Sequence, residues 1–249
     1  MDRKGGQSLR FGAYLIQLLS VVIGSTAMVG FTVFLFTGPW QIVVLYTDLR
    51  AVLAFNVGLS ALFFVQHSGM IRASFKAWFG RQLPAYYHGA VFSIISGICL
   101  YIVVHLWHAS EITLLSAEGP LRLVLRGVFL AAVGSIIWSS LVLHAFDGFG
   151  VQAIRHHLHG NTLPAATFTD HGPYRWVRHP QYCCVLVMIW VHPELTADRL
   201  LFNVLWSSWI VVGTMLEERD LAATFGEQYR DYQSRVPMLI PGLPRQDRG

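Results

Sequence analysis

The chain has 249 residues, of which 54% are hydrophobic and only 13% are charged, with a formal net charge of +4. Soluble domains usually carry about 25% charged residues, so this composition argues against a soluble protein and favours an integral membrane protein. The Lys and Arg residues form no dense patch alternating with aromatic residues, which argues against a nucleic-acid-binding protein.

Four long apolar runs occupy the first part of the chain. They cover residues 14–36, 51–65, 86–107 and 121–143. A hydrocarbon core about 30 Å thick needs roughly 20 helical residues at about 1.5 Å each, so each run predicts a transmembrane helix, the second with some flanking residues. We therefore predict a transmembrane region over residues 1–144 with four full spans.

The rest of the chain differs in composition. Residues 145–180 are polar and predict an interfacial helix followed by a loop. Two apolar stretches follow, 182–191 and 200–216, and the first is too short to span a bilayer. Residues 182–216 therefore predict a helical hairpin, which either spans fully or re-enters the same face.

An amphipathic helix is predicted for the tail, beginning at Glu217 and ending before Pro237. Its apolar residues recur at spacings of three and four, namely Leu221, Phe225, Tyr229 and Tyr232. The predicted fold class is therefore all-α: a polytopic membrane helical bundle of four full spans, a C-terminal helical hairpin and an amphipathic tail helix.

Basic residues are distributed unevenly among the connecting segments. They precede the first span, lie between the second and third, follow the fourth and recur in the tail, whereas residues 108–120 contain none and residues 38–50 contain only Arg50. The positive-inside rule therefore predicts that both termini lie in the cytoplasm. It also places residues 145–249, which we predict to be the catalytic region, on the cytoplasmic side.

Residues 171–182, with the sequence HGPYRWVRHPQY, concentrate polar and aromatic side chains just before an apolar stretch. Arg175, Arg178 and His179 would be costly to bury there unless they form hydrogen bonds or contact a ligand. The alternative is an interfacial belt, in which arginines reach the headgroups and aromatic rings lie at headgroup depth. Residue types alone do not decide between these two interpretations.

Two adjacent acids, Glu217 and Glu218, follow the last apolar stretch. A carboxylate at this position could bind a cationic or amine-bearing ligand. The pair could instead be a solvated helix start, where acidic residues interact favourably with the helix dipole.

Together these elements form the pattern GPYxxxRHPxY followed by EExxLxxxFGxxYxxYxxxVPxxxP, between Gly172 and Pro241. The pattern resembles that of integral membrane methyltransferases related to isoprenylcysteine carboxyl methyltransferase and the phospholipid methyltransferases. The resemblance covers residues 166–241, and it implies an enzyme that uses S-adenosyl-L-methionine as its methyl donor.

The resemblance also assigns residues to the donor site. In that superfamily the His-Pro-x-Tyr segment lines the site, the first Glu of the pair contacts the donor, and the backbone upstream borders the adenine. A carboxylate and tyrosine faces suit a donor that carries a sulfonium and an ammonium group. The residues implied here are Ala166, Thr167, Phe168, Thr169, Tyr174, His179, Pro180, Gln181, Tyr182 and Glu217.

The N-terminal half resembles the bacterial methanethiol S-methyltransferases and their NnrU-like relatives. The similarity lies in Asn56, residues 62–72 (LFFVQHSGMIR) and residues 75–78 (FKAW), and Phe146-Asp147 fits the methyltransferases as well. It implies methylation of a small thiol, methanethiol to dimethyl sulfide, in a bacterial inner membrane.

Four residues receive predicted roles in this reaction. Gln66 and His67, at the cytoplasmic end of the second span, are expected to line the acceptor pocket, unless they are only a polar helix end at the headgroups. Arg178 is the candidate for electrostatic stabilisation near the donor, or it holds the loop. His67 or His179 could take the thiol proton, because the thiolate is the nucleophile.

Two other functions stay open. One is methyl transfer to a lipid-linked acceptor: a prenyl thiol, a prenylcysteine carboxylate or a phospholipid amine. The isoprenylcysteine enzymes carry an Arg four residues before the first Glu to bind the carboxylate, and this chain has Gly213 there. The other is an NnrU-like, non-enzymatic membrane protein.

The expected partners are therefore a small acceptor and membrane lipids. Eleven histidines suggest a metal site, but the HxxxH and HxxHH spacings of membrane di-iron enzymes are missing from the sequence. We therefore expect no metal.

Overall fold

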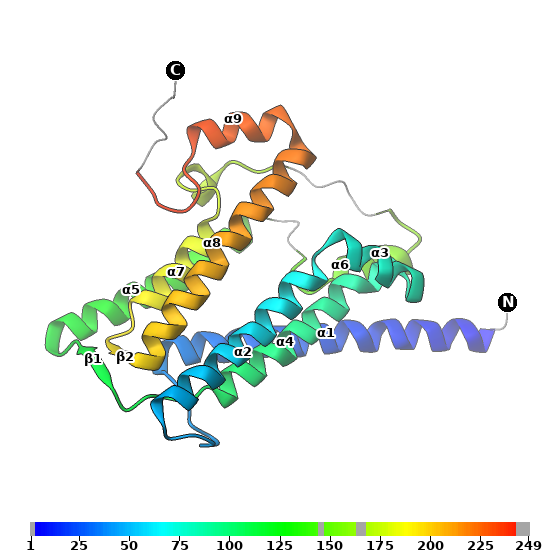
Figure 1. Cartoon of the computed structure of the whole chain (residues 1–249). Coiled ribbons are helices and arrows are strands. Elements are labelled where there is room, and N and C mark those ends of the chain that lie inside the picture. Colours follow the sequence, from blue (N-terminus) through cyan, green and yellow to red (C-terminus); the bar gives the residue numbers. More distant parts are fainter. Residues whose placement is uncertain (1–2, 144–146, 163–167, 243–249) are drawn as a thin grey trace. The chain divides into compact units, whose positions relative to one another are not determined.

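The computed structural model describes residues 3–143, 147–162 and 168–242 (Figure 1). Its regular structure is almost entirely helical, which confirms the prediction of an all-α membrane bundle. Five helices of this described part are long and apolar enough to cross a membrane, so the chain is an integral membrane protein. Their ranges are Arg10–Thr37, Leu49–Met70, Ala85–Leu106, Gly119–Val142 and Ala197–Phe225.

These five helices include the four predicted spans. The fifth, Ala197–Phe225, is the second arm of the predicted hairpin, and its length suffices for a full crossing. The first arm is an apolar helix of 11 residues, Pro180–Trp190, which is too short to span alone. The two arms of the hairpin are therefore unequal.

The chain forms two compact units. The first comprises residues 1–108 and 147–165, and the second comprises residues 109–146 and 166–249. These units are defined by packing. The division into a transmembrane region, residues 1–144, and a catalytic region, residues 145–249, stays a prediction.

Small residues allow close packing in the first unit. A Cβ atom at Gly97 would lie 3.1 Å from the carbonyl oxygen of Ile23, and the Ser93 hydroxyl donates to the carbonyl of Ser20 at 3.2 Å. Of the elements in this unit, the sequence did not predict α3. The elements are α1 (Arg3–Thr37), α2 (Leu49–Met70), α3 (Ala73–Gln82), η1 (Ala85–Tyr87), α4 (His88–Leu106) and the predicted interfacial helix α6 (Val151–Leu158).

A hydrogen-bonded group of four residues, the Asn56–His108 network, lies at the end of the first unit where α4 ends. The Asn56 amide donates to the carbonyl of His108 at 2.8 Å and accepts from its N–H at 3.0 Å. His108 Nε2 accepts from the N–H of Leu45 at 2.8 Å, and Nδ1 lies 2.7 Å from the carbonyl of Leu106. Nδ1 therefore carries the hydrogen, and main-chain groups satisfy both ring nitrogens.

The second unit contains a small antiparallel strand pair that the sequence did not predict. The pair joins the segment before α5 to the segment before α8, so both helices begin at the same end of the unit. The elements are β1 (Thr113–Ser116), α5 (Gly119–Val142), η2 (Gly172–Arg175), α7 (Pro180–Trp190), β2 (Glu194–Thr196), α8 (Ala197–Phe225) and α9 (Glu227–Arg235). Helices α7 and α8 run antiparallel, and Trp190 Nε1 donates to the Ser207 hydroxyl at 2.9 Å.

The predicted start of a tail helix at Glu217 is wrong. Figure 1 shows α8 as one long helix, continuous from Ala197 to Phe225, so both glutamates lie inside its C-terminal part. Residues 217–225 contain no Gly or Pro that would end the helix. The change from apolar to polar residues therefore marks where the helix leaves its apolar surroundings, and not where the helix ends. The interpretation of these acids as a solvated helix start is wrong for the same reason.

Helix α8 ends at a glycine. Gly226 has a φ of +60°, a conformation that favours glycine, and the chain turns there into α9. The predicted end of the tail before Pro237 is confirmed, since α9 stops at Arg235.

Candidate active site

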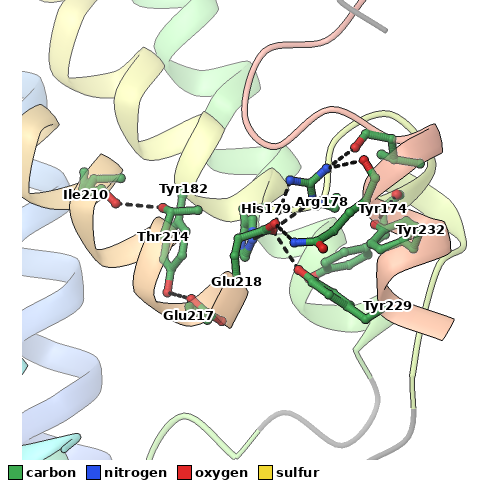
Figure 2. Close-up of polar contacts among 12 residues, drawn as sticks. Tyr174, Arg178, His179, Tyr182, Ile210, Thr214, Glu217, Glu218, Tyr229 and Tyr232 are labelled. Carbon is green, nitrogen blue, oxygen red and sulfur yellow. Dashed lines mark hydrogen bonds and ion pairs between the residues drawn. The ribbon is translucent and has the colours of Figure 1, made fainter. Parts of the chain in front are cut away.

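A single carboxylate, that of Glu218, joins three segments of the second unit (Figure 2). Its oxygens accept five hydrogen bonds from four side chains. The donors are Arg178 Nε at 2.9 Å and Nη2 at 2.7 Å, His179 Nε2 at 2.6 Å, the Tyr229 hydroxyl at 2.8 Å and Gln233 Nε2 at 2.6 Å. We call these five residues the Glu218 cluster.

Arg178 ties the loop before α7 to the end of α9. Besides its two bonds to Glu218, its Nη1 donates to the carbonyls of Gln233 and Val236. Its main-chain N–H donates to the carbonyl of Pro237 at 2.9 Å. The Arg178 and Glu218 side chains are only 7% and 9% exposed, so each buried charge depends on the other. This geometry favours the loop-holding alternative for Arg178.

Glu217 points in a different direction from Glu218, because successive helical residues are about 100° apart. Its Oε2 accepts a hydrogen bond from the Tyr182 hydroxyl at 2.7 Å (Figure 2). Within the described residues, Oε1 accepts none. Glu217 is half-buried, so one carboxylate oxygen remains available to a ligand.

Tyr174 lies within electrostatic reach of Glu217. Burial, together with the negative charge of Glu217, raises the pKa of the Tyr174 phenol to about 12. Its main-chain carbonyl accepts a hydrogen bond from the Tyr232 hydroxyl. Tyr174 and Tyr182 therefore present two neutral phenol rings near one carboxylate.

Aromatic packing supports the site. The rings of His179 and Tyr182 are stacked, with centroids 5.5 Å apart and planes 8° apart. On the other side of the cluster, Phe168 packs against Tyr229 and Tyr232 at centroid distances of 6.1 and 5.2 Å. Burial raises the pKa of Tyr229, and its hydrogen bond to Glu218 raises it further, so the phenol keeps its donor hydrogen.

The local sequence explains how the loop enters α7. Gly172 has a φ of +63° and turns the chain into η2. Pro180 occupies the first turn of α7, where its missing N–H costs nothing. A residue before proline avoids the helical region, and His179 is accordingly non-helical, with φ −124° and ψ 69°. The His-Pro step therefore places the His179 ring just ahead of the helix.

Comparison with known proteins gives a consistent set of relatives. A protein named methanethiol S-methyltransferase from Pseudomonas deceptionensis is 36% identical over 191 residues, covering 76% of this chain and 73% of that protein. One of the same name from Mycobacterium tuberculosis is 32% identical over 187 residues, covering 75% and 77%. The chain belongs to the methanethiol S-methyltransferase family. This membership confirms the resemblance seen in the sequence and the prediction of a membrane methyltransferase.

Nurim from Rattus norvegicus is a more distant relative of this chain. It is 25% identical over 189 residues, covering 70% of each chain. No model of a protein family and no solved structure matches the chain.

Most of the residues expected at the donor site lie in or beside the Glu218 cluster. Tyr174, His179, Pro180, Tyr182 and Glu217 come together at the junction of the loop, α7 and α8. Phe168 and Thr169 lie in the segment leading to η2, whereas Ala166 and Thr167 lie outside the described residues. Gln181 differs, because its amide donates to the Ser140 hydroxyl of α5 at 2.9 Å.

The residues expected to bind the acceptor lie in the first unit. Gln66 donates to the Ser96 hydroxyl of α4 at 3.1 Å. The His67 ring packs on Phe63 and Phe92, with centroid distances of 5.2 and 4.9 Å. Both sit in the last turns of α2, as predicted, and their role in binding the acceptor stays a prediction.

The sequence did not predict the central position of Glu218. One signal for Glu218 was available in the sequence. Two adjacent acids in a helix face different neighbours, so Glu217 and Glu218 were bound to have different partners. The roles of Tyr229 and Gln233 as donors to Glu218 were also missed, because they depend on the turn at Gly226 that folds α9 back.

Proposed function

We propose that this protein transfers the methyl group of S-adenosylmethionine to a small thiol, converting methanethiol to dimethyl sulfide. The observation that carries the proposal is the Glu217 carboxylate, with one oxygen held by Tyr182 and the other without a hydrogen bond from the described residues. S-adenosylmethionine supplies a methyl group made electrophilic by a positively charged sulfur. Relatives named for this reaction support the proposal.

The residues present fit a cationic donor. A carboxylate pairs with ammonium or sulfonium charge, and phenol faces attract cations. Glu217, Tyr174 and Tyr182 would hold the charged end of the donor, and Phe168 and Thr169 would lie along it. The Glu218 cluster would keep the loop and α8 in register, which makes Arg178 and Glu218 positioning residues in this proposal.

The surroundings of Gly213 favour a thiol over a carboxylate acceptor. Gly213 is exposed on α8, one helical turn before Glu217, and beyond the backbone of its own helix no described residue lies within 4 Å of where its Cβ would be. The position therefore offers no cation to a prenylcysteine carboxylate. We propose that Gln66 and His67 line the pocket for the smaller acceptor.

The site is proposed to face the cytoplasm of a bacterial inner membrane, with both chain termini on that side. The uneven distribution of basic residues supports this orientation. The donor would then enter from water, and an apolar thiol would enter from the membrane.

The test is a parallel assay of the purified, detergent-solubilised protein with methyl-labelled S-adenosylmethionine. Methanethiol, a prenylcysteine and phosphatidylethanolamine are supplied separately. We expect labelled dimethyl sulfide with methanethiol and no labelled lipid. Labelled lipid alone would replace the thiol by a lipid-linked acceptor, and failure to bind the donor in calorimetry would contradict the enzyme assignment and support an NnrU-like, non-enzymatic protein.

A further inference from the structure

We infer that His179 is the base that takes the proton from the acceptor thiol, and that Glu218 positions it. The inference rests on the proposed function, and it selects one of the two histidines that the sequence left open. Three observations carry it: the bond to Glu218, the state of the second ring nitrogen and the balance of charge around the ring.

The bond to Glu218 fixes the ring. His179 Nε2 lies 2.6 Å from Glu218 Oε1, and an ionised carboxylate can only accept, so Nε2 carries the hydrogen. The lone pair of the neutral ring is then on Nδ1. Among the described residues, Nδ1 has no hydrogen-bond partner, and the His179 residue is 7% exposed. A buried imidazole with one nitrogen fixed by a carboxylate and the other unprotonated is the arrangement of a general base.

The charges around the ring can accommodate a proton. Glu218 of α8 holds Nε2, and Arg178 and Tyr229 share the same carboxylate. Tyr182 of α7 stacks on the ring, and its hydroxyl donates to Glu217. The donor loses its sulfonium charge when the methyl group leaves. The carboxylates of Glu217 and Glu218 then balance the Arg178 guanidinium and the imidazolium that has formed.

The proposed step is balanced. The S–H bond of the acceptor breaks, and its proton goes to His179 Nδ1. A carbon–sulfur bond forms between the acceptor sulfur and the transferred methyl carbon. The bond from that carbon to the donor sulfur breaks, and its electron pair stays on that sulfur, which becomes a neutral thioether. The imidazolium then returns its proton to water.

His67 is the weaker candidate. Its ring packs on Phe63 and Phe92 in the first unit, whereas His179 has the carboxylate that fixes a single tautomer. The histidine of the RHP motif therefore has the geometry of a base in addition to its expected place beside the donor.

The test compares two acceptors of different acidity. Methanethiol is mostly protonated at pH 7, whereas an aryl thiol such as thiophenol is largely ionised and needs no base. His179→Gln keeps an amide N–H for Glu218 but has no basic nitrogen, and His108→Gln is the control for loss of a buried histidine. For His179→Gln we expect kcat with methanethiol to fall about 100-fold or more at pH 7, and much less with thiophenol or at pH 9.

A second readout is independent of turnover. Calorimetric affinity for S-adenosylhomocysteine should stay within about threefold of wild type in His179→Gln, which also shows that the variant is folded. An equal loss of kcat with both thiols, or a loss of affinity as large as the loss of turnover, would overturn the base assignment but leave the proposed function intact. Absence of product from the wild-type protein with either thiol would refute the proposed function, and the base with it.

Discussion

The Asn56–His108 network of the first unit and the Glu218 cluster of the second both bury a histidine, but they use it differently. His108 is 3% exposed and His179 is 7% exposed. Main-chain groups occupy both nitrogens of His108, so its ring has no remaining capacity to exchange a proton without breaking a bond. A carboxylate occupies one nitrogen of His179, and the other has no partner within the described residues.

The difference shows how to separate structural from chemical histidines in this fold. Burial and hydrogen bonding alone do not distinguish the two rings. The partners do, because a main-chain N–H that donates to a ring nitrogen, as at His108, requires that nitrogen to stay unprotonated, whereas a carboxylate also stabilises the protonated ring. The comparison therefore predicts that changes to the Glu218 cluster alter both stability and catalysis, and that changes to the Asn56–His108 network alter stability only.

The largest effect is expected from Glu218→Ala. The variant leaves the buried Arg178 guanidinium without its carboxylate, which should cost about 3–5 kcal/mol of folding free energy and abolish turnover. Thermal unfolding in detergent measures the change. Glu227→Ala is the control, because Glu227 forms an ion pair with Arg230 in which its side chain is 85% exposed, and its loss should cost under about 1 kcal/mol. Equal shifts in the two variants would show that the Glu218 cluster is not a buried charge network.

Asn56→Ala tests whether the Asn56–His108 network contributes to stability only. It removes the partners of the N–H and carbonyl of His108, which should destabilise the protein by about 1–3 kcal/mol. The fraction that remains folded should keep wild-type kcat and donor affinity. A fall in kcat per folded molecule would mean that the first unit contributes to chemistry through this network.

Much of this molecule could be predicted from its sequence, and the successes and failures have physical reasons. Four spans and the short first arm of the hairpin followed from apolar length, because the bilayer sets that length. The helix boundary at Glu217 was predicted wrongly, because hydropathy reports the surroundings of a helix and not its ends. The turn at Gly226 is what folds Tyr229 and Gln233 back onto Glu218, and no local pattern specified that contact.

At the site, too, the sequence predicted some residues and missed others. The resemblance indicated Tyr182 and Glu217, and the structure places the Tyr182 hydroxyl 2.7 Å from the Glu217 carboxylate. Glu218 received no role, although four side chains donate to it, because adjacent acids look alike until the helix turns them to different neighbours.

Tyr229→Phe should destabilise the protein less than Glu218→Ala or Asn56→Ala. It removes one of the five hydrogen bonds to Glu218 while keeping the ring, and should cost about 0.5–1.5 kcal/mol. Tyr14→Phe, at an exposed position of α1, is the matched control and should change stability little. If the two variants have the same unfolding temperature, the hydroxyl of Tyr229 contributes nothing to the cluster.

A further effect appears only at alkaline pH. The pKa of Tyr174 is raised to about 12, so the folded protein holds this proton more tightly than the unfolded chain, in which a tyrosine has a pKa of about 10. The corresponding stability is present below about pH 10 and is lost as the pH rises to about 12. Ultraviolet titration should show one fewer late-titrating phenol in Tyr174→Phe. In Glu217→Gln, Tyr174 should titrate at lower pH; an unchanged titration would mean that Glu217 does not act on this ring.

The proposed donor site depends most on Glu217, the carboxylate that would receive the cationic donor. Isothermal titration calorimetry of S-adenosylmethionine binding to wild type, Glu217→Gln and the neighbouring exposed-acid control Asp220→Asn tests this directly. We expect a loss of affinity of about tenfold or more for Glu217→Gln, since a charge-assisted hydrogen bond is worth about 1.5–3 kcal/mol, and a change within about twofold for Asp220→Asn. An unchanged dissociation constant in a folded Glu217→Gln protein would contradict the account.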